Sequence, residues 1–171
     1  INMPFIGIIS KENDSNFIKN VISKNSVKNK FEIININKKS IENIKNIKFD
    51  ILVICENIDN MLKESTYLEE IIKRTCYLII NSDIKENLLI LKNIEANIIT
   101  YGFNAKSTIT ISSIKDEKIM LCLQRSIKGI FDIIEEQEFN IDTEGNNMNK
   151  LYNILVIFTI LAVYGEILQK I

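Results

Sequence analysis

The sequence predicts an α/β fold, a Rossmann-like three-layer sandwich with a mostly parallel sheet, an antiparallel β extension and a buried C-terminal helix. Residues 5–101 alternate short β-rich runs with helical patterns, as parallel strands joined by crossover helices do. After residue 101 the hydrophobic period changes to strict alternation, and the chain closes with a long apolar stretch. We interpret the 171 residues as one domain with a parallel part (3–105), an extension (106–145) and a helix (146–171).

The parallel part is expected to contain five strands. Near-continuous apolar runs such as DILVIC indicate strands that are covered on both faces. The strands are predicted at Phe5–Ser10, Phe31–Asn37, Asp50–Cys55, Tyr77–Ile80 and Asn97–Tyr101.

Helices are expected between these strands. One apolar stripe at helical spacing is formed by Phe17, Ile18, Val21 and Ile22, and a second by Ile41, Ile44 and Ile47. Thr66 with Glu69, and Asp83 with Glu86, have the spacing of a capping box. The second pair predicts a helix over Ile84–Lys92 that Asp83 caps.

The extension is expected to be a set of antiparallel strands at hairpin distances. They are predicted at Thr108–Ile114, Ile119–Leu123, Ile130–Ile134 and Gln137–Ile141, with turns at 115–118 and 126–129. The acidic run at residues 135–138 is interpreted as a charged strand edge, with a cation- or partner-facing patch as the alternative. The final helix is apolar nearly all round, which predicts that it packs inside the molecule.

Composition excludes several classes of function. The balance of 21 Lys and Arg against 22 Asp and Glu provides no basic field for nucleic acid. The longest apolar stretch, Ile154–Tyr164, is short of the ~20 residues that span a bilayer, so no membrane span is expected. Cys55, Cys76 and Cys122 lie in apolar runs far apart in sequence and are interpreted as buried, reduced thiols. With no signal-peptide pattern at the start, they predict a cytoplasmic protein.

Residues 77–102 read YLIINSDIKENLLILKNIEANIITYG, a strand, an Asn-x-Asp turn, a helix and a second strand that ends in Tyr-Gly. This string resembles the second half of the central, ATP-binding domain of the Mur ligase family, which has an Asn-Ala-Asp-Asp turn and a Tyr-Gly strand end in these places. Residues 145–155 are similar to a degenerate form of the motif that begins that domain's long apolar helix. The resemblance covers roughly residues 50–171.

The family's catalytic groups are missing from this sequence. No glycine-rich phosphate loop is present, and Lys106-Ser107 lacks the preceding glycines and is followed by a strand-like run. The chain has no His, and no catalytic or metal-binding residue is assigned. The resemblance therefore implies a non-catalytic, Mur-ligase-like pseudoenzyme, a binding or interaction module linked to cell-wall metabolism. A protein partner or a homo-oligomer is left open.

Two alternatives remain. The chain could be one half of a split ATP-dependent ligase that another chain completes, or an unrelated Rossmann-like enzyme that uses the strand ends near Ser10, Glu56 and Asn81. Glu56 follows the strand that Asp50 begins, which places it where it could face a ligand crevice.

The resemblance also names two candidate binding residues. By order, Asn81 corresponds to the family's residue that helps to hold the adenine base, and Asp83 is the next match, so no cofactor is expected other than an adenine nucleotide. An Asn at a strand's carboxyl end can present a donor and an acceptor to a ligand. The alternative is that Asn81 and Asp83 serve only the strand-to-helix connection. Gly102 is expected to adopt a positive φ where the chain leaves the sheet.

Overall fold

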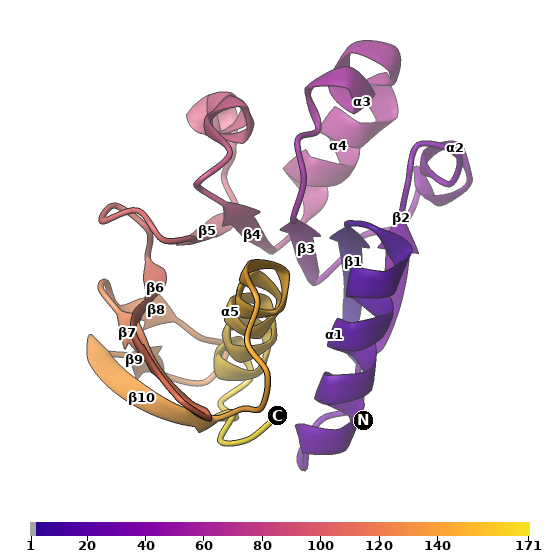
Figure 1. The fold of residues 1–171 in the computed structure, drawn as a ribbon. Coiled ribbons are helices and arrows are strands. Elements are labelled where there is room, and N and C mark those ends of the chain that lie inside the picture. The colour runs from indigo at the N-terminus through magenta and orange to yellow at the C-terminus, as the bar shows by residue number, and fades with distance from the viewer. Residues whose placement is uncertain (1–2) are drawn as a thin grey trace.

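The computed structural model describes residues 3–171, which are arranged around one eight-stranded sheet (Figure 1). Its strands are β1 (Phe5–Ile9), β2 (Glu32–Ile36), β3 (Ile51–Ile54), β4 (Tyr77–Asn81), β5 (Asn97–Tyr101), β6 (Ile109–Lys115), β7 (Lys118–Leu123) and β10 (Gln137–Asp142). Their order across the sheet is β10-β7-β6-β5-β4-β3-β1-β2. The first six pair in parallel, with β6 joining β5 at one residue pair, whereas β7 and β10 are antiparallel.

Helices cover both faces of the parallel strands (Figure 1). They are α1 (Glu12–Asn25), α2 (Ile41–Ile44), α3 (Asp59–Glu64), α4 (Thr66–Arg74), a 3₁₀ helix η1 (Lys85–Asn93) and α5 (Met148–Val163). Alternate strand residues divide between two cores, because successive side chains point to opposite faces. Ile51 and Val53 pack with α1 and α5, whereas Leu52 and Ile54 pack with α2 and α4. The predicted three-layer α/β sandwich is confirmed.

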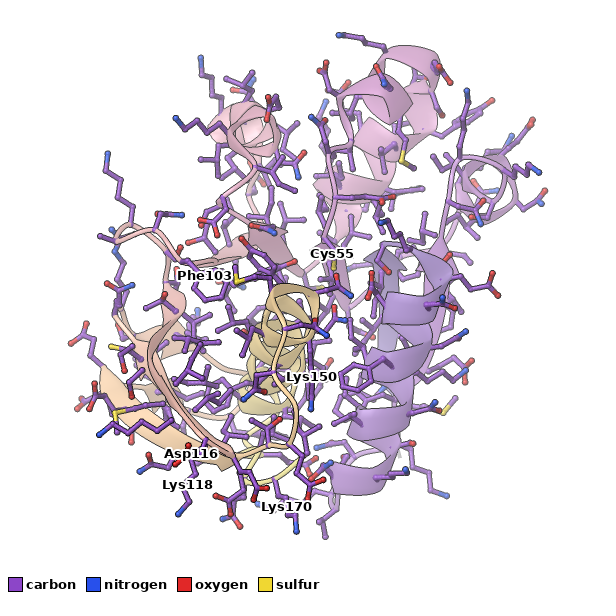
Figure 2. All side chains as sticks on the ribbon, in the orientation of Figure 1. Cys55, Phe103, Asp116, Lys118, Lys150 and Lys170 are labelled. Carbon is purple, nitrogen blue, oxygen red and sulfur yellow. The ribbon has the colours of Figure 1, made fainter. Side chains whose placement is uncertain are left out.

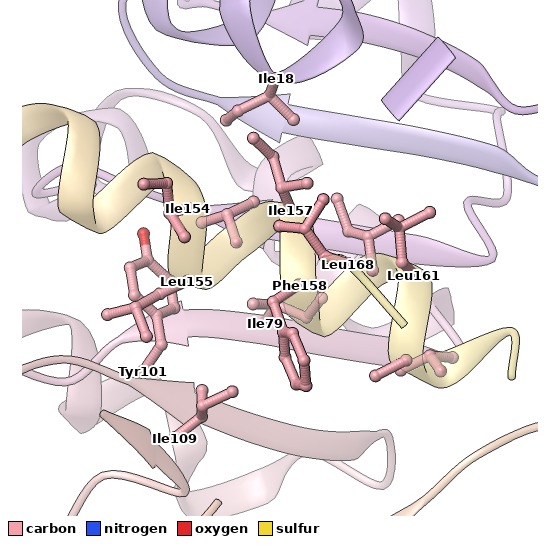
Figure 3. Close-up of a cluster of buried hydrophobic side chains, with 14 of the residues drawn as sticks. Ile18, Ile79, Tyr101, Ile109, Ile154, Leu155, Ile157, Phe158, Leu161 and Leu168 are labelled. Atoms are coloured by element: carbon pink, nitrogen blue, oxygen red, sulfur yellow. The ribbon is translucent and has the colours of Figure 1, made fainter. Parts of the chain in front are cut away.

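Helix α5 lies in the middle of the larger core. Figure 1 shows it between α1 and the curved antiparallel part of the sheet. Leu155 and Phe158 of α5 are fully buried and lie in one cluster with Ile18 of α1, Ile79 of β4 and Ile109 of β6 (Figure 3). Because neighbours surround it, the helix is apolar on nearly every side. The buried C-terminal helix is thus confirmed, although it ends at Val163 rather than at residue 171.

The tail after α5 is held by a buried carboxylate. Glu166 is 8% exposed and accepts hydrogen bonds from the Ser26 hydroxyl (2.8 Å), the Val27 amide (2.7 Å) and the Asn29 side-chain amide (2.7 Å). Burial alone would raise the pKa of this carboxyl, but the donors outweigh it and lower the pKa. A buried charge needs such partners, and these join the C-terminal tail to the loop between α1 and β2.

The predicted strands of the sheet agree with the structure to within one residue at each end. The strand predicted at Ile130–Ile134 and the turn at 126–129 are wrong. Residues Ile127–Lys128 form β8, which pairs with β9 (Ile133–Ile134) in a separate two-stranded sheet. The chain reverses at 129–132 instead, because the Gly129 amide donates to the Asp132 carbonyl (2.9 Å) and Ile130 is held by the end of α5. The acidic residues at 135–138 are exposed, and β10 forms a sheet edge.

The predicted helix starts need correction. Helix α4 has Ser65, not Thr66, at its N-cap and no side-chain cap, and the short α3 before it was not predicted. The segment predicted as a helix over Ile84–Lys92 is the 3₁₀ helix η1, which Asp83 does not cap. Helix α2 has only four residues and ends before Ile47. The cysteines are free thiols as predicted, but all three residues are partly rather than fully buried.

Candidate functional site

A polar crevice lies at the carboxyl ends of the parallel strands. The strand order β2-β1-β3-β4-β5 places a topological switch point between β1 and β3, where the chain connections leave in opposite directions. Open α/β sheets bind their ligands in the crevice at such a point. Here the crevice has a volume of about 270 Å³ and is lined by residues that follow β1, β3 and β4 and by the first turns of α1 and α5. Figure 2 marks Cys55 in this region, near the middle of the molecule and away from Lys118 and Lys170 at its lower end.

Three strand-end residues that the sequence singled out meet in this crevice. Ser10 follows β1, Glu56 follows β3 and Asn81 ends β4, and all three line the cavity. Asp50 lies at the other end of β3, where its carboxylate accepts from the Phe5 amide (2.8 Å) and holds two strands in register. Parallel strands bring their carboxyl ends to one edge, which explains why residues far apart in sequence are neighbours here.

The side chain of Asn81 is oriented by the turn that follows it. Its Oδ1 accepts from the Asp83 amide at 3.0 Å, and the residue is only 5% exposed. Among residues 3–171, its Nδ2 makes no hydrogen bond within the protein. The expectation was that this amide presents both a donor and an acceptor. The turn engages one lone pair of the oxygen, and the amino group is the part of the side chain without a partner in the protein.

Asp83 lies outside the crevice and organises the neighbouring loop. Its carboxylate accepts from the backbone amides of Phe103 (2.8 Å) and Asn104 (3.2 Å), from the Asn104 side chain (2.7 Å) and from the Tyr152 hydroxyl (2.7 Å). This network, and not a helix cap, uses the side chain. Asp83 therefore connects β4, the β5–β6 loop and α5.

Gly102 allows the loop to approach Asp83 this closely. It has a φ of 157°, as expected, and a Cβ at this position would lie 2.7 Å from the Asp83 Oδ1. Partial burial alone would raise the pKa of the Asp83 carboxyl, but the donated hydrogen bonds outweigh it and hold the pKa below its usual value. Burial and the bond to Asp83 raise the pKa of Tyr152 to about 12, so its phenol remains a donor at neutral pH.

The opposite wall of the crevice joins the first turns of α1 and α5. The Asp14 Oδ1 accepts from the side-chain amides of Asn149 (2.5 Å) and Asn153 (2.9 Å). These two asparagines are four residues apart and therefore lie on one face of α5. Sequence reasoning did not assign them as site residues. Their spacing of four residues within the predicted C-terminal helix was the available signal, but their partner Asp14 is distant in sequence.

A tyrosine without a hydrogen-bond partner also lines the crevice. Tyr101 is fully buried, and among residues 3–171 its hydroxyl has no hydrogen-bond partner. Figure 3 shows the hydroxyl pointing toward α5. Burial raises the pKa of Tyr101 well above its usual value and that of the neighbouring Cys55 thiol to about 12. Cys55 is thus a protonated thiol rather than a nucleophile, and the Tyr101 phenol keeps its proton.

Asn87 holds the loop after β3 in place. This residue is 1% exposed, its Oδ1 accepts from the Ile58 amide (3.1 Å) and its Nδ2 donates to the Glu56 carbonyl (2.8 Å). Both amide groups are therefore satisfied, as a buried Asn requires. The consequence for the crevice is that Glu56 and Asn57 are presented by a fixed backbone.

The crevice contains more negative than positive groups. Asp14 and Glu56 line it together with a single cation, Lys11. Within residues 3–171, no three His, Cys, Asp or Glu side chains gather as a metal site would require. Lys106-Ser107 precedes strand β6 and not a helix, unlike the lysine of a phosphate loop. The arrangement is suited to a neutral polar or cationic ligand and is unfavourable for a triphosphate.

No protein-family model and no curated protein matches this chain. None of the helices in residues 3–171 combines the length and the apolar character needed to cross a membrane.

Proposed function

We propose that this chain is a non-catalytic binding module that holds a neutral, flat, polar ligand, such as the base of an adenine nucleoside, in the crevice at the ends of β1, β3 and β4. The orientation of Asn81 carries the proposal, because its oxygen is fixed by the Asp83 amide and its amino group remains available beside the cavity. The resemblance of residues 77–102 to the Mur ligase central domain supports the adenine assignment and a cytoplasmic role in cell-wall metabolism.

The size and charge of the crevice limit the ligand. Its volume of about 270 Å³ is slightly below the ~300–1,000 Å³ typical of pockets for drug-sized molecules, which fits a base or nucleoside better than a whole nucleotide. The carboxylates of Asp14 and Glu56 would repel a triphosphate. We therefore expect adenosine to bind at least as tightly as ATP, with or without Mg²⁺.

A thermal-shift titration with adenosine, uridine and ATP tests this proposal. A ligand at 100 times its Kd stabilises the folded state by about 2.7 kcal/mol, and each kcal/mol moves the Tm of a protein of this size by roughly 2–4 °C. Asn81→Asp keeps the oxygen that accepts from the Asp83 amide but replaces the amino group, so the adenosine shift should disappear. Asn140→Asp, an exposed change on β10, introduces the same charge and should leave the shift intact. An equal shift in Asn81→Asp, or no shift with adenosine, would refute the proposal.

One observation favours a second candidate. The crevice gathers Ser10, Glu56 and Asn81, the residues expected for a Rossmann-like enzyme unrelated to Mur ligases. The β10 edge of the sheet exposes polar and acidic side chains, so this edge offers no apolar surface that the second half of a split ligase would cover. If the crevice were catalytic, turnover of a bound compound would be lost in Glu56→Gln while its binding persisted.

A further inference from the structure

A second concavity lies on the other side of the connection between β4 and η1. It has a volume of about 730 Å³ and is separate from the crevice, with Asp83 and the β5–β6 loop forming part of its wall. Three cations from three elements line it: Lys85 at the start of η1, Lys106 in the β5–β6 loop and Arg125 after β7. This concavity is called the basic groove below.

The three cations of the basic groove are exposed and unpaired within the described chain. In residues 3–171, none of them has a carboxylate oxygen within 4.0 Å, although four other lysines form ion pairs. The one carboxylate that lines the groove, Asp83, already accepts four hydrogen bonds. The groove therefore carries net positive charge, while the whole chain has a net charge of −1.

The neutral polar groups of the basic groove already have partners. The Ser82 hydroxyl contacts the Ser107 hydroxyl at 2.8 Å, and the Thr100 hydroxyl contacts that of Thr108 at 3.1 Å. Leu88 and Ala105 add apolar surface between the cations. The groups left to bind a ligand are thus two lysine ammonium groups, the Arg125 guanidinium and the apolar surface of the groove. A guanidinium can form bidentate hydrogen bonds to an oxyanion.

From this arrangement we propose that the basic groove binds a small organic anion, a molecule with an apolar body that carries phosphate or carboxylate groups. A volume of about 730 Å³ lies within the range for small-molecule pockets. The charge of the groove is opposite to that of the crevice, so the two sites select different ligands. This inference does not depend on the nucleoside proposal.

The test is an NMR titration of the isotopically labelled chain with 1-naphthyl phosphate, 1-naphthoate and neutral 1-naphthol. The anionic probes should shift the amide signals of Ala105, Lys106 and Arg125 in a saturable way and at least tenfold more tightly than 1-naphthol. The anion that binds with the lower Kd shows whether the groove prefers a phosphate or a carboxylate. Binding should weaken in 0.5 M salt, because salt screens exposed charges.

Matched variants decide whether these three cations are responsible. Combining Lys85→Gln, Lys106→Gln and Arg125→Gln should weaken the binding of the anionic probes at least tenfold. Combining Lys19→Gln, Lys115→Gln and Lys128→Gln removes the same charge from exposed positions elsewhere and should change it less than twofold. The proposal fails if neither anion gives a saturable shift, if both triple variants weaken binding equally, or if the shifts are confined to Asn81 and Tyr101 in the crevice.

Discussion

At the scale of single residues, Asp83 connects three parts of the chain next to the site. Its carboxylate accepts four hydrogen bonds, and two of them come from backbone amides of the loop that follows Gly102. Asx residues at the end of a strand are usually read as helix caps, and the sequence supported that interpretation. The loop is the stronger competitor here, because several donors converge on the same carboxylate, whereas a cap would supply one or two.

Asp83→Asn should destabilise the protein by roughly 1.5–3 kcal/mol at pH 7. The substitution removes hydrogen bonds to a charged acceptor and places the donor amino group of Asn against backbone N–H donors. The folded-state pKa of Asp83 is lowered. Its contribution is therefore present above the unfolded pKa of about 3.9 and is lost as the pH falls through the folded value. Urea unfolding of both proteins at several pH values measures the difference.

The control is Asp132→Asn, an exposed change whose effect should stay within about 0.5 kcal/mol. The free energy of unfolding of Asp83→Asn should approach that of the original protein between pH 5 and pH 2.5. If this difference in free energy did not shrink, the lowered pKa of Asp83 would not be the source of the stability.

At the scale of elements, α5 shows how one helix serves both the core and the site. Its first turn begins with Asn147, whose side chain accepts from the Lys150 amide at 2.9 Å. This cap fixes the start of the helix, and thereby places Asn149 and Asn153 against Asp14. The apolar remainder of the helix lies in the core.

Asn147→Ala should cost about 1 kcal/mol, the usual effect of removing an N-cap side chain. The measurement is the free energy of unfolding in urea. Met148→Ala changes an exposed side chain in the same turn and should cost less than about 0.5 kcal/mol. Equal effects of the two substitutions would mean that the observed cap is not a source of stability.

At the scale of the whole molecule, α5 joins the parallel and antiparallel parts of the sheet. It contacts α1 on one side and β5 and β6 on the other, and its Phe158 packs against Phe139 of β10 with ring centroids 4.7 Å apart. A helix enclosed in this way cannot leave without exposing the larger core. We therefore expect the parallel and antiparallel parts to unfold together.

Phe158→Ala should cost about 3–5 kcal/mol through lost burial and a residual cavity. Far-UV circular dichroism and tyrosine fluorescence should report one coincident urea transition, both before and after the substitution. Phe131→Ala is the matched control, since Phe131 is 68% exposed and its removal should cost less than about 0.5 kcal/mol. Two separate transitions in the original protein would show that the antiparallel part folds independently of the parallel part.

The sequence by itself determined the fold class and the five parallel strands, because continuous apolar runs record burial on both faces and periodicity is a local property. It also identified Ser10, Glu56 and Asn81 as strand-end residues, which the topology of a parallel sheet brings to one edge. The buried position of the last helix followed from its apolar circumference.

Only the tertiary structure decided which partners these residues have. Asp83, which was expected to cap a helix, accepts hydrogen bonds from a distant loop instead. The segment after it is a 3₁₀ helix, and the second hairpin lies at residues 127–134. The pairing of Asp14 with Asn149 and Asn153, and the grouping of the cations in the basic groove, join residues far apart in sequence. Hydrogen bonds and electrostatic fields depend on distances in space, which local sequence patterns do not record.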